Sequence, residues 1–246
     1  MKNKKIRKMK KIILSFIALI FTLSINAQLD RSVMPLGGPS PKIKLDKPKE
    51  FKLKNGIRVL VVENHKLPRI NYSLRFDRKP IVEGEKTGVI SLLGSMLGNG
   101  TTNIPKDDFN EEVDFLGAGI NVGFGSGFAF TLTKNNERVL DLFSDAVINP
   151  LLTEEEFEKE KDKLIEGLKS QKKDIDAISG RVGDALSYGK NHAYGEFISE
   201  QTIENIKFED ILEYHAKYFI PNNVYIVVIG DVNYKEVKSL ISEKFG

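Results

Sequence analysis

The sequence contains no cysteine and no tryptophan, and only three of its 246 residues are histidine. Without cysteine there is no disulfide framework, so a stable domain has to rest on a hydrophobic core of reasonable size. The three histidines share no spacing that is typical of metal ligands. We interpret His65 as an exposed turn residue, His215 as a helix residue at the surface or its boundary, and His192 as part of a loop.

Acidic side chains are absent from residues 1–27, which hold seven lysines and arginines. An apolar run from Ile12 to Ile25 follows the basic residues, and Ala27 stands before Gln28. This order is typical of a secretory signal peptide. The run is shorter than the roughly 20 residues that a membrane-spanning helix needs. We therefore predict an exported, periplasmic protein with no membrane span once the signal peptide has been removed.

The positive charge of the chain lies in that leader. Subtracting its seven basic side chains from the formal net charge of +3 leaves −4 for the remainder. A mildly acidic chain without a basic stripe is not typical of nucleic-acid-binding proteins. Nucleic acid is therefore not a predicted partner.

Proline and glycine separate the leader from the rest of the chain. Residues 28–50 hold four of the nine prolines and read as a linker. Residues 51–246 suffice for one domain. Their strand and helix patterns do not alternate regularly, which predicts an α+β sandwich, a mainly antiparallel sheet with helices packed on one face.

Turn and cap residues locate the elements of this domain. Asn55-Gly56 predicts a hairpin between two strands, and Pro105 and Gly117 bound a helix. Thr153 with Glu156 predicts a capping box for a long charged helix. Strands are expected at residues 51–54, 57–63, 70–76, 120–122, 128–132 and 224–229. Helices are expected at 106–116, 137–148, 154–173, 178–188 and 234–245, with shorter helices within 203–219.

A further helix is predicted between Gly88 and Thr101, where the sequence reads Gly-Val-Ile-Ser-Leu-Leu-Gly-Ser-Met-Leu-Gly-Asn-Gly-Thr. An ordinary amphipathic helix is one interpretation, with Ile90, Leu93, Met96 and Leu97 packed inward. The frame also resembles the zinc helix of the pitrilysin/insulinase peptidases, which carries an inverted His-x-x-Glu-His motif.

In that frame the two histidine positions are Ser91 and Ser95, and the glutamate position is Gly94. Helical spacing places both serines on one face, as two zinc-binding imidazoles would require. Serine is not a usual zinc ligand, and glycine has no carboxylate to activate water. The resemblance therefore implies a zinc helix that keeps its frame and has lost its chemistry.

The resemblance extends over Phe51 to Gly246, through the hairpin, the degenerate helix, the charged helix, a His-Ala-Tyr-Gly loop and a Val-Ile-Gly-Asp strand. The family's third zinc ligand, a glutamate, falls on Gly167, and its supporting acidic residue falls on Glu160. A slip of one residue would place Glu166 at the ligand position. One carboxylate without two histidines still makes no zinc site, so we expect no metal and no cofactor in this chain.

Members of this family bind extended peptides along an exposed strand edge, by β-augmentation. The matching strand has five residues. A proline at its centre should remove a main-chain donor of the strand and so weaken peptide binding. Its glycines allow another backbone to approach closely but weaken the strand, so a structural and a binding role are both open. The predicted substrate-binding residues are Gly119, Ile120, Asn121, Val122 and Gly123.

The resemblance implies a subunit that is not catalytic on its own. Its partner would be a zinc-bearing homologous subunit, and together they would enclose extended peptides. A purely structural scaffold subunit is the main alternative, and an active peptidase with unrecognised ligands is a third. Family subunits usually contain two copies of this domain, so we expect the sequence to be the first part of a longer protein.

Overall fold

The computed structural model describes residues 37, 38, 40, 47–222 and 224–246. The chain divides into two units, residues 1–45 and 46–246. In the first unit only Gly37, Gly38 and Ser40 are described; they are exposed and without regular structure. The predicted signal peptide, residues 1–27, lies outside the described residues. The following paragraphs concern the second unit.

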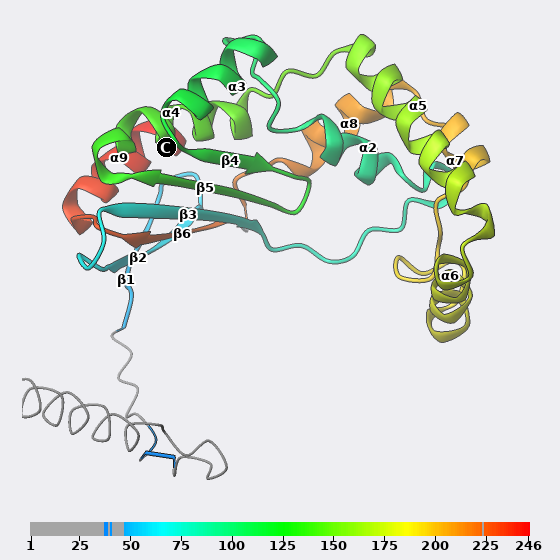
Figure 1. Ribbon diagram of the computed structural model, residues 1–246, viewed down its shortest axis with the longest axis horizontal. Coiled ribbons are helices and arrows are strands. Elements are labelled where there is room, and N and C mark those ends of the chain that lie inside the picture. The colour runs from blue at the N-terminus through cyan, green and yellow to red at the C-terminus, as the bar shows by residue number, and fades with distance from the viewer. Residues whose placement is uncertain (1–36, 39, 41–46, 223) are drawn as a thin grey trace, which may run out of the picture. The chain divides into compact units, whose positions relative to one another are not determined.

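A six-stranded sheet forms the centre of this unit, in the order β1-β2-β6-β3-β5-β4 (Figure 1). All neighbouring strands are antiparallel except β2 and β6, which run parallel. This parallel pair brings the last strand in sequence to the middle of the sheet. The strands are β1 Lys49–Lys52, β2 Arg58–Glu63, β3 Arg69–Phe76, β4 Gly119–Val122, β5 Ser126–Leu132 and β6 Val224–Gly230.

Alternating side chains give the sheet one buried face and one open face. Ile70, Tyr72 and Leu74 of β3 are almost completely buried, as period-2 alternation requires. On the opposite face, Phe128 and Phe130 of β5 stay nearly half exposed. One face of the sheet therefore carries the core.

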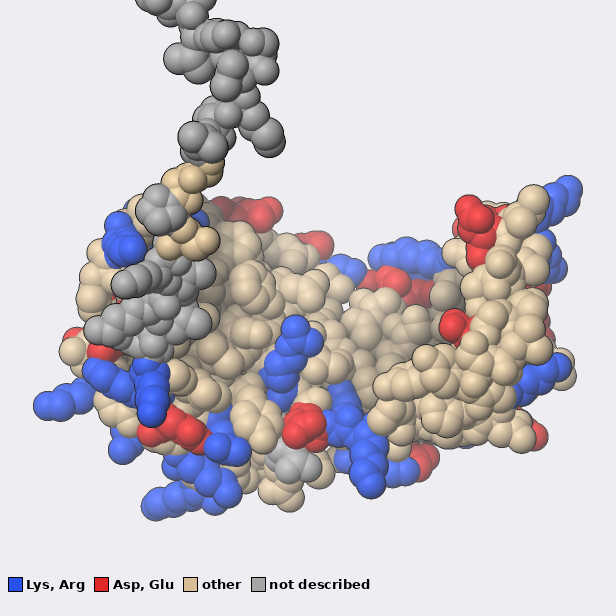
Figure 2. All heavy atoms as spheres, turned by 90° about the horizontal axis from the view of Figure 1, so that it is seen from below, with Lys and Arg blue, Asp and Glu red and all other residues tan. Residues whose placement is uncertain are grey.

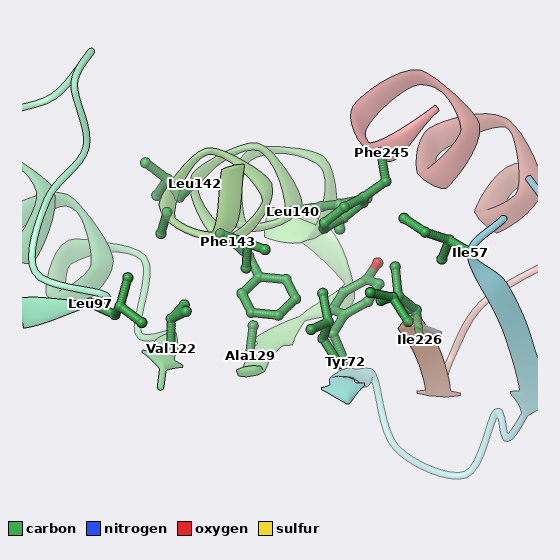
Figure 3. Close-up of a cluster of buried hydrophobic side chains, with 14 of the residues drawn as sticks. Ile57, Tyr72, Leu97, Val122, Ala129, Leu140, Leu142, Phe143, Ile226 and Phe245 are labelled. Atoms are coloured by element: carbon green, nitrogen blue, oxygen red, sulfur yellow. The ribbon is translucent and has the colours of Figure 1, made fainter. Parts of the chain in front are cut away.

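Helices α3 Lys106–Phe115, α4 Asn136–Ile148 and α9 Tyr234–Phe245 lie on the buried face. Figure 3 shows Phe143 of α4 pointing at the sheet between Ala129 and Tyr72, with Phe245 of α9 beside it. The rings of Phe143 and Phe245 are 6.3 Å apart and meet edge to face, a favourable geometry for aromatic pairs. This layer confirms the predicted α+β sandwich with helices on one face.

A second group of helices lies past the ends of the strands, on the side where β4 ends (Figure 1). It contains α2 Val89–Met96, α5 Glu154–Ser170, α7 Glu200–Glu204 and α8 Phe208–Tyr218, with the short 3-10 helix η2 Gly84–Lys86 leading into α2. Helix α2 packs against both α5 and α8. Helix α6, Ile175–Tyr188, follows α5 through the 3-10 turns η4 Gln171–Lys173 and has no buried residue; a similar turn, η3 Thr133–Asn135, precedes α4.

The element positions agree with the predicted ones in most places, and the differences include those at β1, at the start of α5 and at the start of α6. Strand β1 begins at Lys49, so the last residues of the predicted linker 28–50 pair with β2. The hydroxyl of Thr153 accepts the Glu156 N–H at 3.3 Å, but the Glu156 carboxylate binds Lys106 instead of closing the capping box. Helix α6 begins earlier than predicted because Asp174 caps it. The Asp174 carboxylate accepts the N–H groups of Asp176 and Ala177.

Candidate functional site

Helix α2 forms where the zinc-helix frame predicts it. The apolar residues Leu92, Leu93 and Met96 are at most 1% exposed. Ser91 and Ser95 are exposed on the other side of the helix. The Ser95 hydroxyl donates a hydrogen bond to the Leu92 carbonyl at 2.9 Å. The helix thus keeps its packing face, and its outward face carries only small side chains.

Phe124 lies directly over the glutamate position of the motif. A Cβ atom added at Gly94 would be 3.8 Å from the Phe124 nitrogen and 4.0 Å from its Cβ, an ordinary contact distance. The guanidinium of Arg78 lies 3.8 Å from the centre of the Phe124 ring and donates to the carbonyls of Phe124 and, at 3.2 Å, Tyr218. Phe124 thus borders the glutamate position of the motif at an ordinary contact distance, and Arg78 stacks on the ring of the same residue.

The third ligand position also lacks a donor. Gly167 lies on α5, seven residues after Glu160 and therefore on the same side of the helix. A Cβ at Gly167 would meet nothing within 4 Å. The Glu160 carboxylate forms an ion pair with Lys163 at 2.5 Å. Helix α5 thus carries open space at the ligand position and a surface ion pair at the supporting position.

The histidines are used elsewhere. His65 is exposed and its Nδ1 lies 2.7 Å from Asp231, and His192 accepts the Tyr194 N–H within its loop. The His215 ring stacks on Phe219, 4.6 Å between centres. Burial lowers the pKa of His215, and its Nε2 has no hydrogen-bond partner among the described residues. Within those residues, no group of three or more His, Cys, Asp or Glu side chains could share a metal ion.

These donor sets do not fit zinc. Two hydroxyls on α2 and a glycine on α5 cannot replace two imidazoles and a carboxylate. No catalytic step through a metal can therefore be derived from this chain.

A carboxylate outside the motif fixes the start of α2. Glu83 accepts the N–H groups of Gly88 and Ile90 at 3.1 and 2.9 Å, which satisfies donors that a helix start leaves free. Burial raises the pKa of Glu83, and the nearby Glu196 carboxylate adds to the shift, while the N–H groups oppose it. This cap is not predictable from the sequence, because Glu83 lies five residues before Gly88 rather than at a usual cap position.

Among the residues that the structure describes, strand β4 pairs only with β5, so it is an edge strand. The Gly123 N–H donates to the Ser126 carbonyl at 2.8 Å. Because bonded pairs alternate along an antiparallel ladder, Asn121 with Phe128 is also a bonded pair. The main-chain groups of Ile120 and Val122 therefore point to the free edge.

This register corrects the role given to Asn121. Its N–H is directed at β5. A proline at this position would therefore break the hydrogen bonding between β4 and β5, and it would not remove a donor that a bound peptide could use. Ile120 offers the outward N–H instead. At the other end of the edge, Gly98 follows α2 with φ of 74°, and a Cβ there would be 2.9 Å from the Val122 nitrogen. The turn after α2 thus lies against Val122 and leaves Ile120 as the open position.

The outer face beside this edge is aromatic. A Cβ at Gly119 would lie 2.2 Å from the Phe130 ring, so only glycine lets that ring lie across β4. Phe128 is 6.2 Å from Phe130, between ring centres, and Asn121 is exposed next to them. The structure therefore places the predicted residues Gly119, Ile120, Asn121, Val122 and Gly123 at a sheet edge beside α2.

Two family models match the sequence. The model described as insulinase, peptidase family M16, matches residues 81–185, and the peptidase M16 inactive domain matches residues 205–246. An uncharacterized zinc protease, YmxG of Bacillus subtilis, is 23% identical over 199 residues, covering 78% of this chain and 48% of its own. The mitochondrial-processing peptidase subunit beta of Rattus norvegicus is 24% identical over 201 residues, covering 79% and 41%.

The fold of the chain is shared with a solved structure. The crystal structure of a protease from Helicobacter pylori superposes with a TM-score of 0.74 at 24% identity, covering 82% of this chain and 50% of that one. The chain spans about half the length of the curated relatives it matches.

An α+β domain with a helix in the zinc-helix frame beside an open strand edge defines a peptidase-type domain. The chain belongs to the insulinase family, peptidase family M16. Within the residues that the structure describes, no helix is both long and apolar enough to cross a membrane.

Proposed function

We propose that this chain is a non-catalytic partner subunit of an exported zinc peptidase, and that it holds an extended peptide along β4. The observation that carries the proposal is that α2 is formed and packed while its three motif positions are Ser91, Gly94 and Ser95. The zinc-bearing subunit would supply the metal and the water-activating carboxylate. Export rests on the predicted signal peptide, residues 1–27.

The strand edge supports the peptide-holding part of the proposal. An added strand would pair with the outward N–H and carbonyl of Ile120. Its side chains on the open face would meet Asn121, Phe128 and Phe130, so apolar or aromatic peptide residues fit there. Main-chain pairing would allow β4 to bind peptides of many sequences, and the aromatic face would favour peptides with apolar or aromatic side chains.

A scaffold role without peptide binding is the second candidate. One observation favours it: the turn after α2 lies against Val122 and shortens the free edge. The two candidates differ in whether the Ile120 N–H takes part in binding.

The test is to co-express the chain with a zinc-bearing homologue from the same source and to measure association and cleavage of extended peptides. We expect a stable complex that cleaves faster than the homologue alone. Ile120→Pro should lower peptide affinity at least severalfold, since proline on an edge strand removes the outward donor. Ile120→Val keeps the N–H and a similar volume, and serves as the matched control.

Each outcome separates the candidates. A complex whose peptide affinity is the same for Ile120→Pro and Ile120→Val, with both variants folded in thermal melts, would leave the scaffold role. Absence of any complex would contradict the partner proposal altogether. About one zinc ion per purified chain in elemental analysis would contradict the non-catalytic assignment.

A further inference from the structure

Arg78 is held in one position beyond the end of β3. Its guanidinium donates hydrogen bonds to the carbonyls of Phe124 and, at 3.2 Å, of Tyr218. The guanidinium carbon lies 3.8 Å from the centre of the Phe124 ring, 5.0 Å from that of Phe76 and 5.8 Å from that of Tyr218. Cation–π contacts at these distances are attractive, so two carbonyls and three rings fix the side chain.

The charge of Arg78 lacks an acidic partner. Among the residues that the structure describes, Arg58 pairs with Glu50 and Arg138 with Glu112, but no carboxylate forms an ion pair with Arg78. Arg78 is partly buried, and burial lowers the pKa of its guanidinium. A charge that is partly removed from water is unfavourable unless an anion compensates it.

The guanidinium also keeps free donors. It has five N–H groups in a planar fork, and the two carbonyls of Phe124 and Tyr218 take two of them. The side chain is partly exposed, so a group from outside the chain can approach it. The fork matches a carboxylate, which accepts two parallel hydrogen bonds from it. Arg78 is therefore arranged to receive a carboxylate from another molecule.

Phe124 places this guanidinium beside the proposed peptide site. It stands in the turn between β4 and β5, where the Gly123 N–H donates to the Ser126 carbonyl at 2.8 Å. On the side of α2, a Cβ atom at Gly94 would lie 3.8 Å from the Phe124 nitrogen. Phe124 therefore borders both the helix in the zinc-helix frame and Arg78.

The distance along β4 fits a peptide side chain. Phe124 is four residues beyond Ile120, the position with the outward N–H. An extended chain rises about 3.3 Å per residue, so a peptide paired at Ile120 reaches the level of Phe124 after about four residues, roughly 13 Å. A carboxylate at that spacing comes within reach of Arg78.

The charges around Arg78 leave room for an anion. Lys79 is exposed next to it, and the ammonium of Lys217 lies 5.2 Å from the ring centre of Tyr218. Asp77, on the other side in sequence, is exposed. Figure 2 shows that the surface at α6 is mostly uncharged, whereas Lys and Arg side chains gather on the lower side of the part that holds the sheet. Positive charge of this kind attracts anions before contact.

We propose that Arg78 is a specificity-determining residue that binds a carboxylate of the peptide held along β4. The carboxylate belongs either to an acidic side chain or to the C-terminus of the peptide, and both present the same two oxygens. The inference rests on the proposed function and names its substrate class, which is peptides with a carboxylate about four residues from the one paired with Ile120.

The test compares Glu with Gln in otherwise identical peptides. Short extended peptides with blocked ends carry one Glu, moved along the sequence, or Gln at the same place, and fluorescence anisotropy measures their affinity for the purified chain. At one position we expect Glu to bind about tenfold more tightly than Gln, as a charge-assisted pair does. Arg78→Gln should reduce this ratio to about one. Lys79→Gln removes the same charge from an exposed neighbour and should leave the ratio unchanged.

A purely structural role of Arg78 gives a different result, because loss of its carbonyl bonds would weaken Glu and Gln peptides equally. Arg78→Lys keeps the charge without the planar fork, so part of the ratio should return. Thermal melts show whether the variants fold. The wild type gives a measurement that needs no variant: the ratio should fall in about 1 M salt, where the screening length is about 3 Å, and a ratio that salt leaves unchanged would count against the ion pair.

Peptides with a free C-terminus and no Glu form the second arm. If Arg78→Gln weakens these peptides instead of the Glu peptides, the bound carboxylate is the terminal one. Peptides that bind equally well whatever their charge, or a ratio that Arg78→Gln leaves unchanged, would overturn the inference and leave the peptide-holding role of β4. Failure to bind any peptide would overturn the proposed function itself, and the inference with it.

Discussion

Helices α2 and α6 use similar side chains in opposite ways. In α2, the apolar residues Leu92, Leu93 and Met96 are buried, and the outward positions are serine and glycine. In α6, no residue is buried, and Ile175 and Leu186 point into solvent. The helix in the zinc-helix frame has its apolar side fully packed, whereas α6 leaves its apolar side chains exposed. The same kinds of side chain therefore contribute to the core in α2 and to the surface in α6.

The largest expected effect separates the two helices by stability. Leu93→Ala in α2 removes a completely buried side chain, so the free energy of unfolding should fall by about 2–5 kcal/mol. Denaturant titration measures it. Leu92→Ala should behave in the same way, and a loss below about 1 kcal/mol for both would show that α2 is not part of the core.

The next test asks whether the frame of α2 still admits zinc. Ser91→His, Gly94→Glu, Ser95→His and Gly167→Glu together should restore zinc binding, because the helix already gives the required spacing. Stability should then rise by about 2.7 kcal/mol at free zinc one hundred times the dissociation constant. Thermal melts with and without zinc measure the rise. The triple variant lacking Gly167→Glu is the control, and a folded quadruple variant that binds no zinc would show that Gly167 is not the ligand position.

A smaller effect concerns the ion pair that fixes the approach to α2. Lys86 contacts Asp210 of α8 at 2.5 Å. Burial alone would raise the pKa of Asp210, but the Lys86 ammonium and the Lys207 N–H lower it below its usual value. A carboxylate with a lowered folded pKa stabilises the fold above about pH 4, the unfolded value, and that stability is lost as the pH falls through the folded pKa.

Asp210→Asn should therefore cost about 1 kcal/mol at neutral pH, since solvent screens the half-exposed Lys86. The variant should also lose less stability than the wild type on acidification. Denaturant midpoints at pH 7 and pH 3 check both statements. Parallel pH profiles for variant and wild type would contradict the pairing.

The smallest effect completes the comparison. Leu186→Ala in α6 should change the free energy of unfolding of the monomer by no more than about 0.5 kcal/mol, because its side chain is already in solvent. Denaturant titration followed by circular dichroism measures the change. A cost like that of Leu93→Ala would mean that α6 packs against its own chain.

Local signals in the sequence predicted most elements, because turns and caps are short-range features. Gly56, with φ of 103°, and Gly117, with φ of 59°, stand where the hairpin and the helix stop were expected. The parallel pairing of β2 with β6 could not be predicted, since it joins segments more than 160 residues apart by register alone.

The candidate site was predictable to a different degree. The motif positions on α2 follow from spacing within one helix, and the structure places them as expected on its exposed side. The direction of each N–H along β4 depends on the register with β5. The sequence prediction therefore assigned the outward donor to Asn121, whereas the structure assigns it to Ile120. The apolar side chains of α6 were present in the sequence as Ile175, Ile178 and Val182, but only the structure shows that nothing in the described chain buries them.

The surroundings of Gly94 keep the packing of α2 independent of the motif's chemistry. A Cβ atom at position 94 would lie 3.8 Å from the Phe124 nitrogen and 4.0 Å from the Phe124 Cβ, which are ordinary contact distances. The backbone therefore has room for a side chain at this position, and residue 94 can change while Leu92, Leu93 and Met96 stay buried. Chains with and without the glutamate can in this way share one fold, so the fold by itself does not report activity.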